Sequence, residues 1–105
     1  MAKLEIRREI CSDEIRLRLG GSLDGRTARL LRQTLEALPR GRLVVLDFER
    51  VRPFSDIGIA VLAHEIRSLG RVYRIEGLSL HQQRLFRYFG VSLAPSQALE
   101  QEAAL

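Results

Sequence analysis

The chain has 105 residues, of which 46% are hydrophobic and 29% charged, and this length and composition exclude a disordered chain and favour one globular domain spanning residues 1–105. Its formal net charge of +4 is too small to decide the class of partner, and the single cysteine, Cys11, excludes an internal disulfide or a cysteine-based metal site. Because the chain starts without a signal-peptide pattern and contains no apolar segment of about 20 residues, we expect a cytoplasmic protein without a membrane span.

Two short strands are predicted at the start of the chain. Residues 4–10 and 15–19 alternate apolar with charged side chains, which is the pattern of a strand with one buried face. The polar residues 11–14 between them indicate a hairpin, and therefore an antiparallel pair at one side of a sheet. Gly20 and Gly21 are expected to interrupt the second strand.

A helix is predicted next. Asp24 offers a carboxylate in the N-cap position, and apolar residues spaced from Ala28 to Leu38 form one face. Pro39 and Gly41 are expected to end this helix. Arginines fall largely on its opposite side, as an amphipathic helix that covers a sheet requires.

A buried strand and a second helix follow. The four apolar residues 43–46 indicate a central strand that is covered on both faces. After residues 50–54 the apolar spacing changes and becomes helical until Gly70. Ser55 or Asp56 is the expected cap, so a short connection between strand and helix presents two polar residues.

The last third of the chain continues the alternation. Residues 72–75 predict a short strand, and Ser79 with Gln82 forms the capping box of a helix. A short edge strand over 91–93 and a final helix over 97–104 are also expected. The order β-β-α-β-α-β-α-(β)-α predicts a single-domain α/β fold with a four- to five-stranded mixed sheet and flanking helices.

The chain carries few residues that could perform catalysis. It has two histidines, His64 and His81, and no Gly-rich phosphate loop. Asp47 and Asp56 are expected to flank the strand-to-helix connection, where open α/β sheets place their sites. Two carboxylates without a third ligand argue against a metal site, and an enzyme that uses Asp47 or Asp56 as acid or base is a distant alternative. We therefore expect no enzyme activity and no cofactor.

The basic balance allows a second alternative. Arg26, Arg29, Arg32 and Arg71 could support weak nucleic-acid binding. The arginines alternate with apolar and acidic residues instead of clustering, and the sequence shows no nucleic-acid motif or aromatic stacking platform. A solvated surface is the ordinary interpretation, so no specific nucleic-acid partner is expected.

Three motifs resemble the STAS family, the domain of anti-sigma factor antagonists and of sulphate-transporter tails. Gly21-Ser22-Leu23-Asp24 is similar to the family's G-x-L-D, and Val44-Val45-Leu46-Asp47 is similar to its central V-V-L-D strand. Phe54 to Leu62 resembles its F-x-D-S-S-G-L-x-x-L loop and helix. Their order and spacing extend the resemblance over nearly the whole chain.

The resemblance implies a non-enzymatic partner-switching module that binds an anti-sigma factor or a related kinase-like regulator. In the family the partner phosphorylates a loop serine, but aligning on Gly58 puts Asp56 at the acceptor position and Ile57 at the second serine. Asp56 cannot take a stable phosphoester and could only imitate one in part; Ser55 is a displaced candidate acceptor. The expected partner-binding or switch-loop residues are Ser22, Asp24, Arg26, Phe54, Ser55, Asp56, Ile57, Gly58 and Ile59.

A related role is left open by the sequence. STAS-like single domains also serve as accessory subunits of lipid or anion transporters, where an ATPase subunit would be the partner. The sequence does not separate signalling from this role, and it does not predict an oligomeric state.

Overall fold

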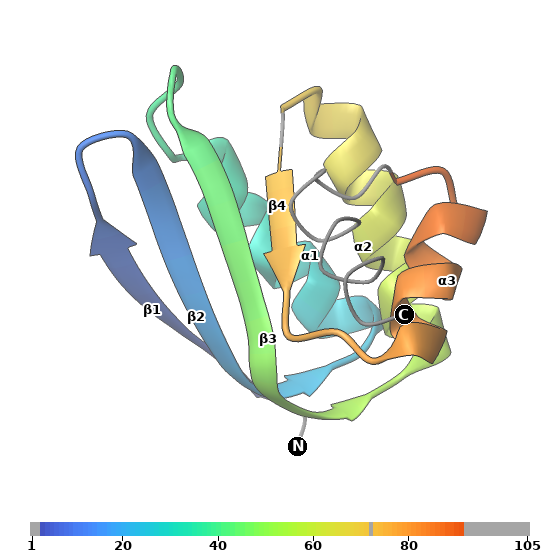
Figure 1. Cartoon of the computed structure of the whole chain (residues 1–105). Coiled ribbons are helices and arrows are strands. Elements are labelled where there is room, and N and C mark those ends of the chain that lie inside the picture. Colours follow the sequence, from blue (N-terminus) through green and yellow to red (C-terminus); the bar gives the residue numbers. More distant parts are fainter. Residues whose placement is uncertain (1–2, 72, 92–105) are drawn as a thin grey trace, which may run out of the picture.

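The computed structural model describes residues 3–71 and 73–91, and these form one α/β unit (Figure 1). The strands make one sheet in the order β1-β2-β3-β4, antiparallel between β1 and β2 and parallel elsewhere. The elements are β1 (Leu4–Ile10), β2 (Glu14–Leu23), α1 (Gly25–Glu36), β3 (Leu43–Phe54), α2 (Asp56–Leu69), β4 (Tyr73–Glu76) and α3 (Leu80–Tyr88). The predicted α/β fold with a mixed sheet is confirmed, with four strands in the described part.

The second strand runs through the two glycines that were expected to interrupt it. β2 continues past Gly20 and Gly21 to Leu23, with shifts in its register to β3. Gly21 has a positive φ of 84°, and a Cβ there would lie 2.1 Å from the carbonyl oxygen of Lys3. The N–H of Ser22 donates to the same oxygen at 2.8 Å. The prediction was wrong because glycine lets the strand bend and still stay paired.

The third strand is also longer than predicted. Residues 50–54 pair with the end of β2, where Arg50 lies opposite Gly20 and Phe54 opposite Leu23. Val51 is only 2% exposed, so this part of the strand contributes to the core. Only one residue, Ser55, separates β3 from α2, and the expected connection of several residues does not exist.

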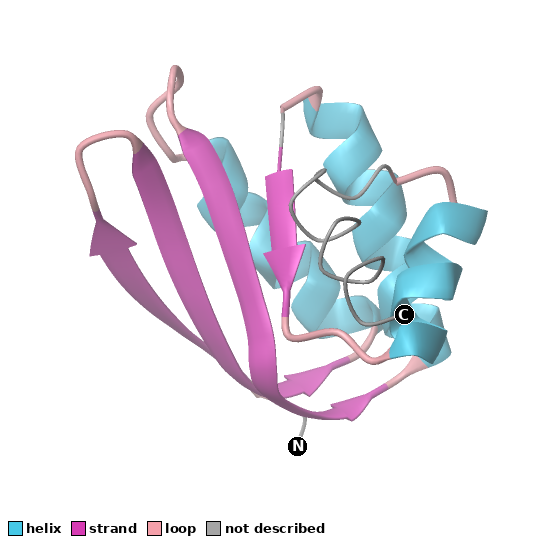
Figure 2. Cartoon of the chain, viewed as in Figure 1, coloured by secondary structure: helices cyan, strands magenta, loops and turns pink. Residues whose placement is uncertain are grey.

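The helices gather on one side of the sheet. α1 and α2 lie behind the strands, and α3 packs beside α2 (Figures 1 and 2). The buried core between them includes Leu17, Leu31, Leu46, Leu62, Ile75 and Phe86, each no more than 1% exposed. The predicted edge strand over 91–93 and final helix over 97–104 lie almost entirely outside the described residues, apart from Val91, which is not in a strand.

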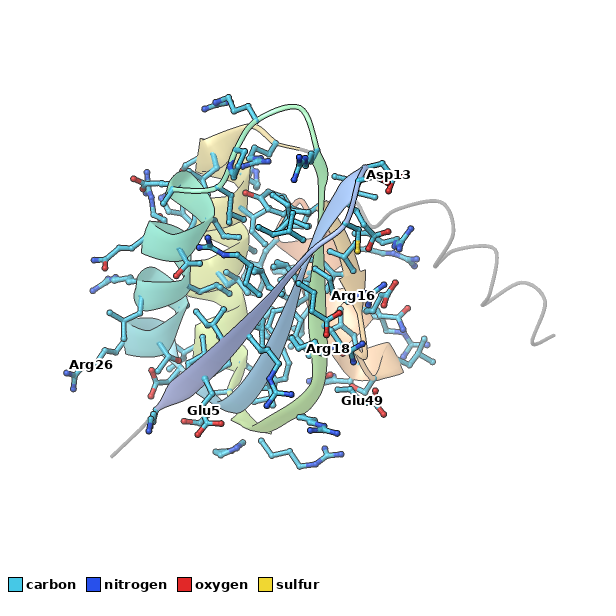
Figure 3. All side chains as sticks on the ribbon, turned by 90° about the vertical axis from the view of Figure 1, so that its left-hand side faces the viewer. Glu5, Asp13, Arg16, Arg18, Arg26 and Glu49 are labelled. Carbon is cyan, nitrogen blue, oxygen red and sulfur yellow. The ribbon has the colours of Figure 1, made fainter. Side chains whose placement is uncertain are left out.

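Charged side chains, among them Arg16 and Arg18, lie on the face of the sheet that is turned away from α1 and α2, the open face (Figure 3), and several of them form ion pairs. Arg16 Nη1 lies 2.7 Å from Glu76 Oε1, and Arg74 Nε lies 3.1 Å from Glu76 Oε2. Glu14 is 3.6 Å from Arg16 and 3.7 Å from Arg74. Val45 lies between these two arginines in register and is fully buried. Aliphatic arginine stems thus help to bury a strand that was expected to be covered on both faces.

The pKa of Glu76 reflects this network. Desolvation is the largest single influence and raises the pKa, but the hydrogen bond and charge of Arg16 and the charge of Arg74 together lower it below the usual value. A carboxylate with a lowered folded-state pKa stabilises the fold above its unfolded pKa, and this contribution disappears as the pH falls through the folded pKa.

Replacing Glu76 with Gln tests this linkage. We expect a loss of about 1 kcal/mol or less at pH 7, because the ion pairs are partly exposed. Between about pH 5 and pH 3 the variant's free energy of unfolding falls less than that of the wild type. Urea unfolding at several pH values measures this free energy. Glu49→Gln is the control, because Glu49 is an exposed carboxylate near the same face. Equal pH dependence in Glu76→Gln and wild type would contradict the assignment.

Candidate functional site

The starts of α1 and α2 meet where β2 and β3 end. The backbone N–H of Ser55 donates to the carbonyl oxygen of Leu23 at 3.0 Å, which ties the end of β3 to the end of β2. Because each strand leads directly into its helix at this point, the first turns of both helices lie at the same edge of the sheet. Two sequence motifs 30 residues apart thus form one surface.

Gly58 permits the close contact between these two turns. A Cβ at Gly58 would lie 2.7 Å from the carbonyl oxygen of Leu23 and 2.9 Å from the Cα of Asp24, and both are backbone atoms that cannot rotate away. At Gly25 a Cβ would lie 3.6 Å from Val61 Cγ2 and 3.9 Å from Ile57 Cγ2, which is ordinary contact. The junction therefore requires glycine at position 58, whereas a methyl side chain would fit at position 25.

Asp24 holds the start of α1. Its carboxylate accepts a hydrogen bond from the N–H of Thr27 at 2.9 Å, and the Thr27 hydroxyl accepts one from the N–H of Asp24 at 2.9 Å. The Thr27 hydroxyl also donates to the carbonyl oxygen of Ser22 at 2.9 Å. The hydrogen bond from the Thr27 backbone lowers the pKa of Asp24, and the same bond confirms the predicted N-cap role of Asp24.

Ser55 caps α2 while the next two residues face solvent. The hydroxyl of Ser55 accepts the N–H of Gly58 at 2.8 Å, so Ser55 and not Asp56 is the N-cap. Asp56 keeps 68% of its side chain exposed, and Ile57 is 72% exposed although it is a large apolar residue. Asp56 and Ile57 are therefore the side chains that this turn presents to solvent.

The start of α3 adds two side chains that sequence reasoning did not include. His81 Nε2 lies 3.5 Å from Asp56 Oδ1, and Leu80 is 55% exposed. The Ser79 and Gln82 capping box is confirmed and marks where α3 begins, but nothing in the sequence relates that turn to α2. The contact between His81 and Asp56 follows only from the packing of α3 against α2.

The expected site residues differ in what they offer to a partner. Arg26, Asp56 and Ile57 are exposed, while Gly58 and Ile59 are buried. The rest, Ser22, Asp24, Phe54 and Ser55, are half-buried, and the Phe54 ring packs 5.2 Å from that of Phe48. We call Arg26, Asp56, Ile57, Leu80 and His81 the junction surface.

Asp47 lies elsewhere. Asp47 and Asp56 were expected to flank the strand-to-helix connection, but Asp47 sits within β3 opposite Glu76, with its carboxylate 3.9 Å from Arg18. The strand continues for seven more residues to Phe54. Within residues 3–71 and 73–91 no three His, Cys, Asp or Glu side chains form a group that could hold a metal ion. The two carboxylates do not form one catalytic site.

Two of the arginines considered for nucleic-acid binding have internal partners. Arg32 pairs with Glu36 and with Glu65, a buried residue of α2. Arg71 donates to the carbonyl oxygens of Leu38, Pro39 and Arg42 at 3.2, 2.7 and 3.3 Å. These guanidinium groups join parts of the fold and leave fewer donors for a phosphate backbone.

A hollow of about 520 Å³ lies on the open face beside β1, and no sequence pattern predicts it. Its charged side chains have both signs, and Arg18 in it bridges Glu9 at 2.6 Å. The hollow is lined by Glu5, Ile6, Arg7, Glu9, Arg18, Leu19, Gly20, Asp47, Glu49 and Arg50. This balance of charge suits no single kind of small ion.

Comparison with known families identifies the fold. A family model described as "Mlab, STAS domain" matches residues 6–93, which is most of the chain. The chain belongs to the STAS domain family. No curated protein matches the sequence as a relative, and no helix in the described part of this STAS domain is long and apolar enough to cross a membrane.

Solved structures support the same fold. An anti-sigma factor antagonist from Mycobacterium paratuberculosis is 19% identical, with a TM-score of 0.64 over 94% of this chain and 93% of that one. The unphosphorylated anti-sigma factor antagonist SpoIIAA is 16% identical, with a TM-score of 0.56 over 96% and 98%. The protein Mglu is 28% identical to this chain, with a TM-score of 0.61 over 70% of this chain. The match covers only 20% of the length of Mglu. This STAS domain therefore resembles anti-sigma factor antagonists in fold.

Gly58→Ala tests the close contact at the junction. We expect it to lower the free energy of unfolding by about 3 kcal/mol, because the added methyl group meets backbone atoms of Leu23 and Asp24. Gly25→Ala is the matched control and should stay within about 0.5 kcal/mol of wild type. Chemical denaturation measures both. Similar stability of the two variants would show that the junction is not tightly packed.

Ser55→Ala tests the assignment of the α2 cap. Loss of the hydrogen bond to Gly58 should cost about 1 kcal/mol. Ser68→Ala, at an exposed position of the same helix, should cost less, since alanine favours a helix interior. Thermal unfolding followed by circular dichroism compares them, and an unchanged midpoint for Ser55→Ala would refute the cap.

Proposed function

We propose that this STAS domain is a non-enzymatic protein-interaction module that resembles an anti-sigma factor antagonist in role and binds its partner through the junction surface. The observation that carries the proposal is Ile57, a large apolar side chain that is 72% exposed at the first turn of α2. Exposed apolar residues rimmed by charges are typical of protein interfaces. Leu80, 55% exposed at the start of α3, adds a second apolar contact.

The charges around Ile57 suit a specific partner. Arg26 is exposed on α1 and follows Gly25, where a Cβ would lie 3.9 Å from Ile57 Cγ2. Asp56 precedes Ile57 in α2 and lies 3.5 Å from His81 of α3. Complementary charges steer association and exclude wrong partners more than they raise affinity. An apolar centre with charges of both signs thus supports binding to a protein better than binding to a nucleic acid.

The module has an aspartate where a serine-phosphorylation switch would have its acceptor. Asp56 stands at the proposed acceptor position and carries about half the charge of a phosphoserine. Ser55, the displaced candidate acceptor, already uses its hydroxyl to cap α2, and phosphorylation there would have to replace that hydrogen bond. We therefore favour a surface of fixed charge, with Ser55 phosphorylation as a secondary proposal that intact-mass measurement of the native protein would reveal.

The leading partner is an anti-sigma factor or a related kinase-like regulatory protein in the cytoplasm of a bacterium. Support comes from the likeness to anti-sigma factor antagonists, one of which, SpoIIAA, has been solved in a phosphorylated and an unphosphorylated form. Such a partner would place this protein in signalling and transcription regulation.

A second candidate is an accessory subunit of a lipid or anion transporter, bound to its ATPase subunit. The specific observation in its favour is again Asp56, because a subunit that stays bound needs no phosphorylatable residue at that place. Purifying the native protein with its partners and identifying them by mass spectrometry separates the two candidates.

Ile57→Asp tests the docking role once a partner is in hand. We expect affinity to fall about tenfold or more, since the apolar contact is replaced by a second carboxylate beside Asp56. Asp56→Lys should weaken binding through charge. Gln33→Ala is the control, because Gln33 lies on α1 about two helical turns beyond Arg26, and it should bind as wild type. Isothermal titration measures each, and unchanged affinity in both junction variants would overturn the proposal.

A further inference from the structure

The first strand of this STAS domain has an outer edge that no strand of the described chain covers. β1 is a terminal strand of the sheet (Figure 1), and its 7 residues exceed the 4 residues of β4 at the opposite edge. A long free edge presents N–H and C=O groups with which another strand can pair. β1 is therefore the part of the sheet most open to a further strand.

Two hydrogen bonds determine which backbone groups of β1 point outward. The N–H of Ser22 donates to the carbonyl oxygen of Lys3 at 2.8 Å, and the N–H of Cys11 donates to the carbonyl oxygen of Glu14 at 2.9 Å. The odd-numbered residues of this stretch thus bond to β2. Since alternate residues of an antiparallel strand bond to opposite sides, the outward N–H and C=O groups belong to Leu4, Ile6, Arg8 and Ile10.

The side chains of the odd-numbered residues alternate in charge. Lys3, Glu5, Arg7 and Glu9 read plus, minus, plus, minus. In the register with β2, Arg7 lies opposite Arg18, so these side chains share the open face of the sheet. When a second copy of this row is turned through 180° about a suitable centre, each positive side chain of one copy lies opposite a negative side chain of the other.

The centre that achieves this is Ile6. If a second copy of β1 lies antiparallel with Ile6 opposite Ile6, then Glu5 of each copy faces Arg7 of the other copy. In the same way, Lys3 of each copy faces Glu9 of the other copy. Centring the pair on Arg7 would instead set Arg7 against Arg7 and Glu5 against Glu9, and like charges directly opposite are destabilising.

The backbone agrees with this choice. With Ile6 opposite Ile6, the outward groups of the two Ile6 residues bond to each other, and those of Leu4 bond to those of Arg8. We propose that two copies of this STAS domain pair through β1 in this register and join their sheets into one. The inference uses only β1 and does not depend on the proposed function.

Sedimentation velocity of the full chain tests the proposal. We expect a reversible dimer that forms within a concentration series extending to about 1 mM, the range of weak, small interfaces. Glu5→Lys and Arg7→Glu should each weaken dimerisation about 30-fold, because two opposite-charge pairs become like-charge pairs. An equimolar mixture of the two variants should recover association, since it sets opposite charges across both positions again.

Two further variants separate the edge from the rest of the molecule. Arg8→Pro removes an N–H that faces outward and leaves the bonds between β1 and β2 in place, so it should abolish the dimer without changing the circular dichroism spectrum. Glu49→Lys changes a charge outside β1 and should leave the dimer intact. A protein that stays monomeric throughout the series, or a dimer that Glu5→Lys and Arg8→Pro leave unchanged, would overturn the proposal.

Discussion

The contact between Gly58 and the end of β2 holds together the end of this STAS domain at which α1 and α2 begin. Because Gly58 has no side chain, the first turn of α2 approaches the backbone of Leu23 and Asp24 more closely than any other residue at position 58 would allow. That approach puts the starts of α1 and α2 next to each other. The caps at Asp24 and Ser55 then set the direction of each helix, and the exposed side chains of both turns follow from this geometry.

Much of the fold could be predicted because the hydrophobic pattern of each element agrees with its position. The alternation in β1 packs Leu4 and Ile6 against the core, and the helical spacing in α2 buries a stripe from Ile59 to Ile66. The ends of β2 and β3 could not be predicted, since Gly20 and Gly21 weaken a strand by local preference and pairing with both β1 and β3 keeps this stretch extended. Tertiary hydrogen bonds decided the outcome there.

The candidate site divides in the same way. Ser55, Asp56 and Ile57 could be located because they precede a clear helical pattern. Their roles could not be assigned, since the choice of cap depends on which oxygen reaches the N–H of Gly58. The contribution of His81 was beyond sequence reasoning, because it arises from how α3 packs against α2, and no local pattern encodes the contact between two helices.

The single residue between β3 and α2 has a consequence for how this surface meets a partner. A chain that passes from strand to helix through Ser55 alone, with its N–H and its hydroxyl both bonded, has almost no conformational freedom left to lose. Association then costs little ordering entropy on this side. A partner that docks on the junction surface, as proposed, would meet the backbone of Asp56 and Ile57 already in position.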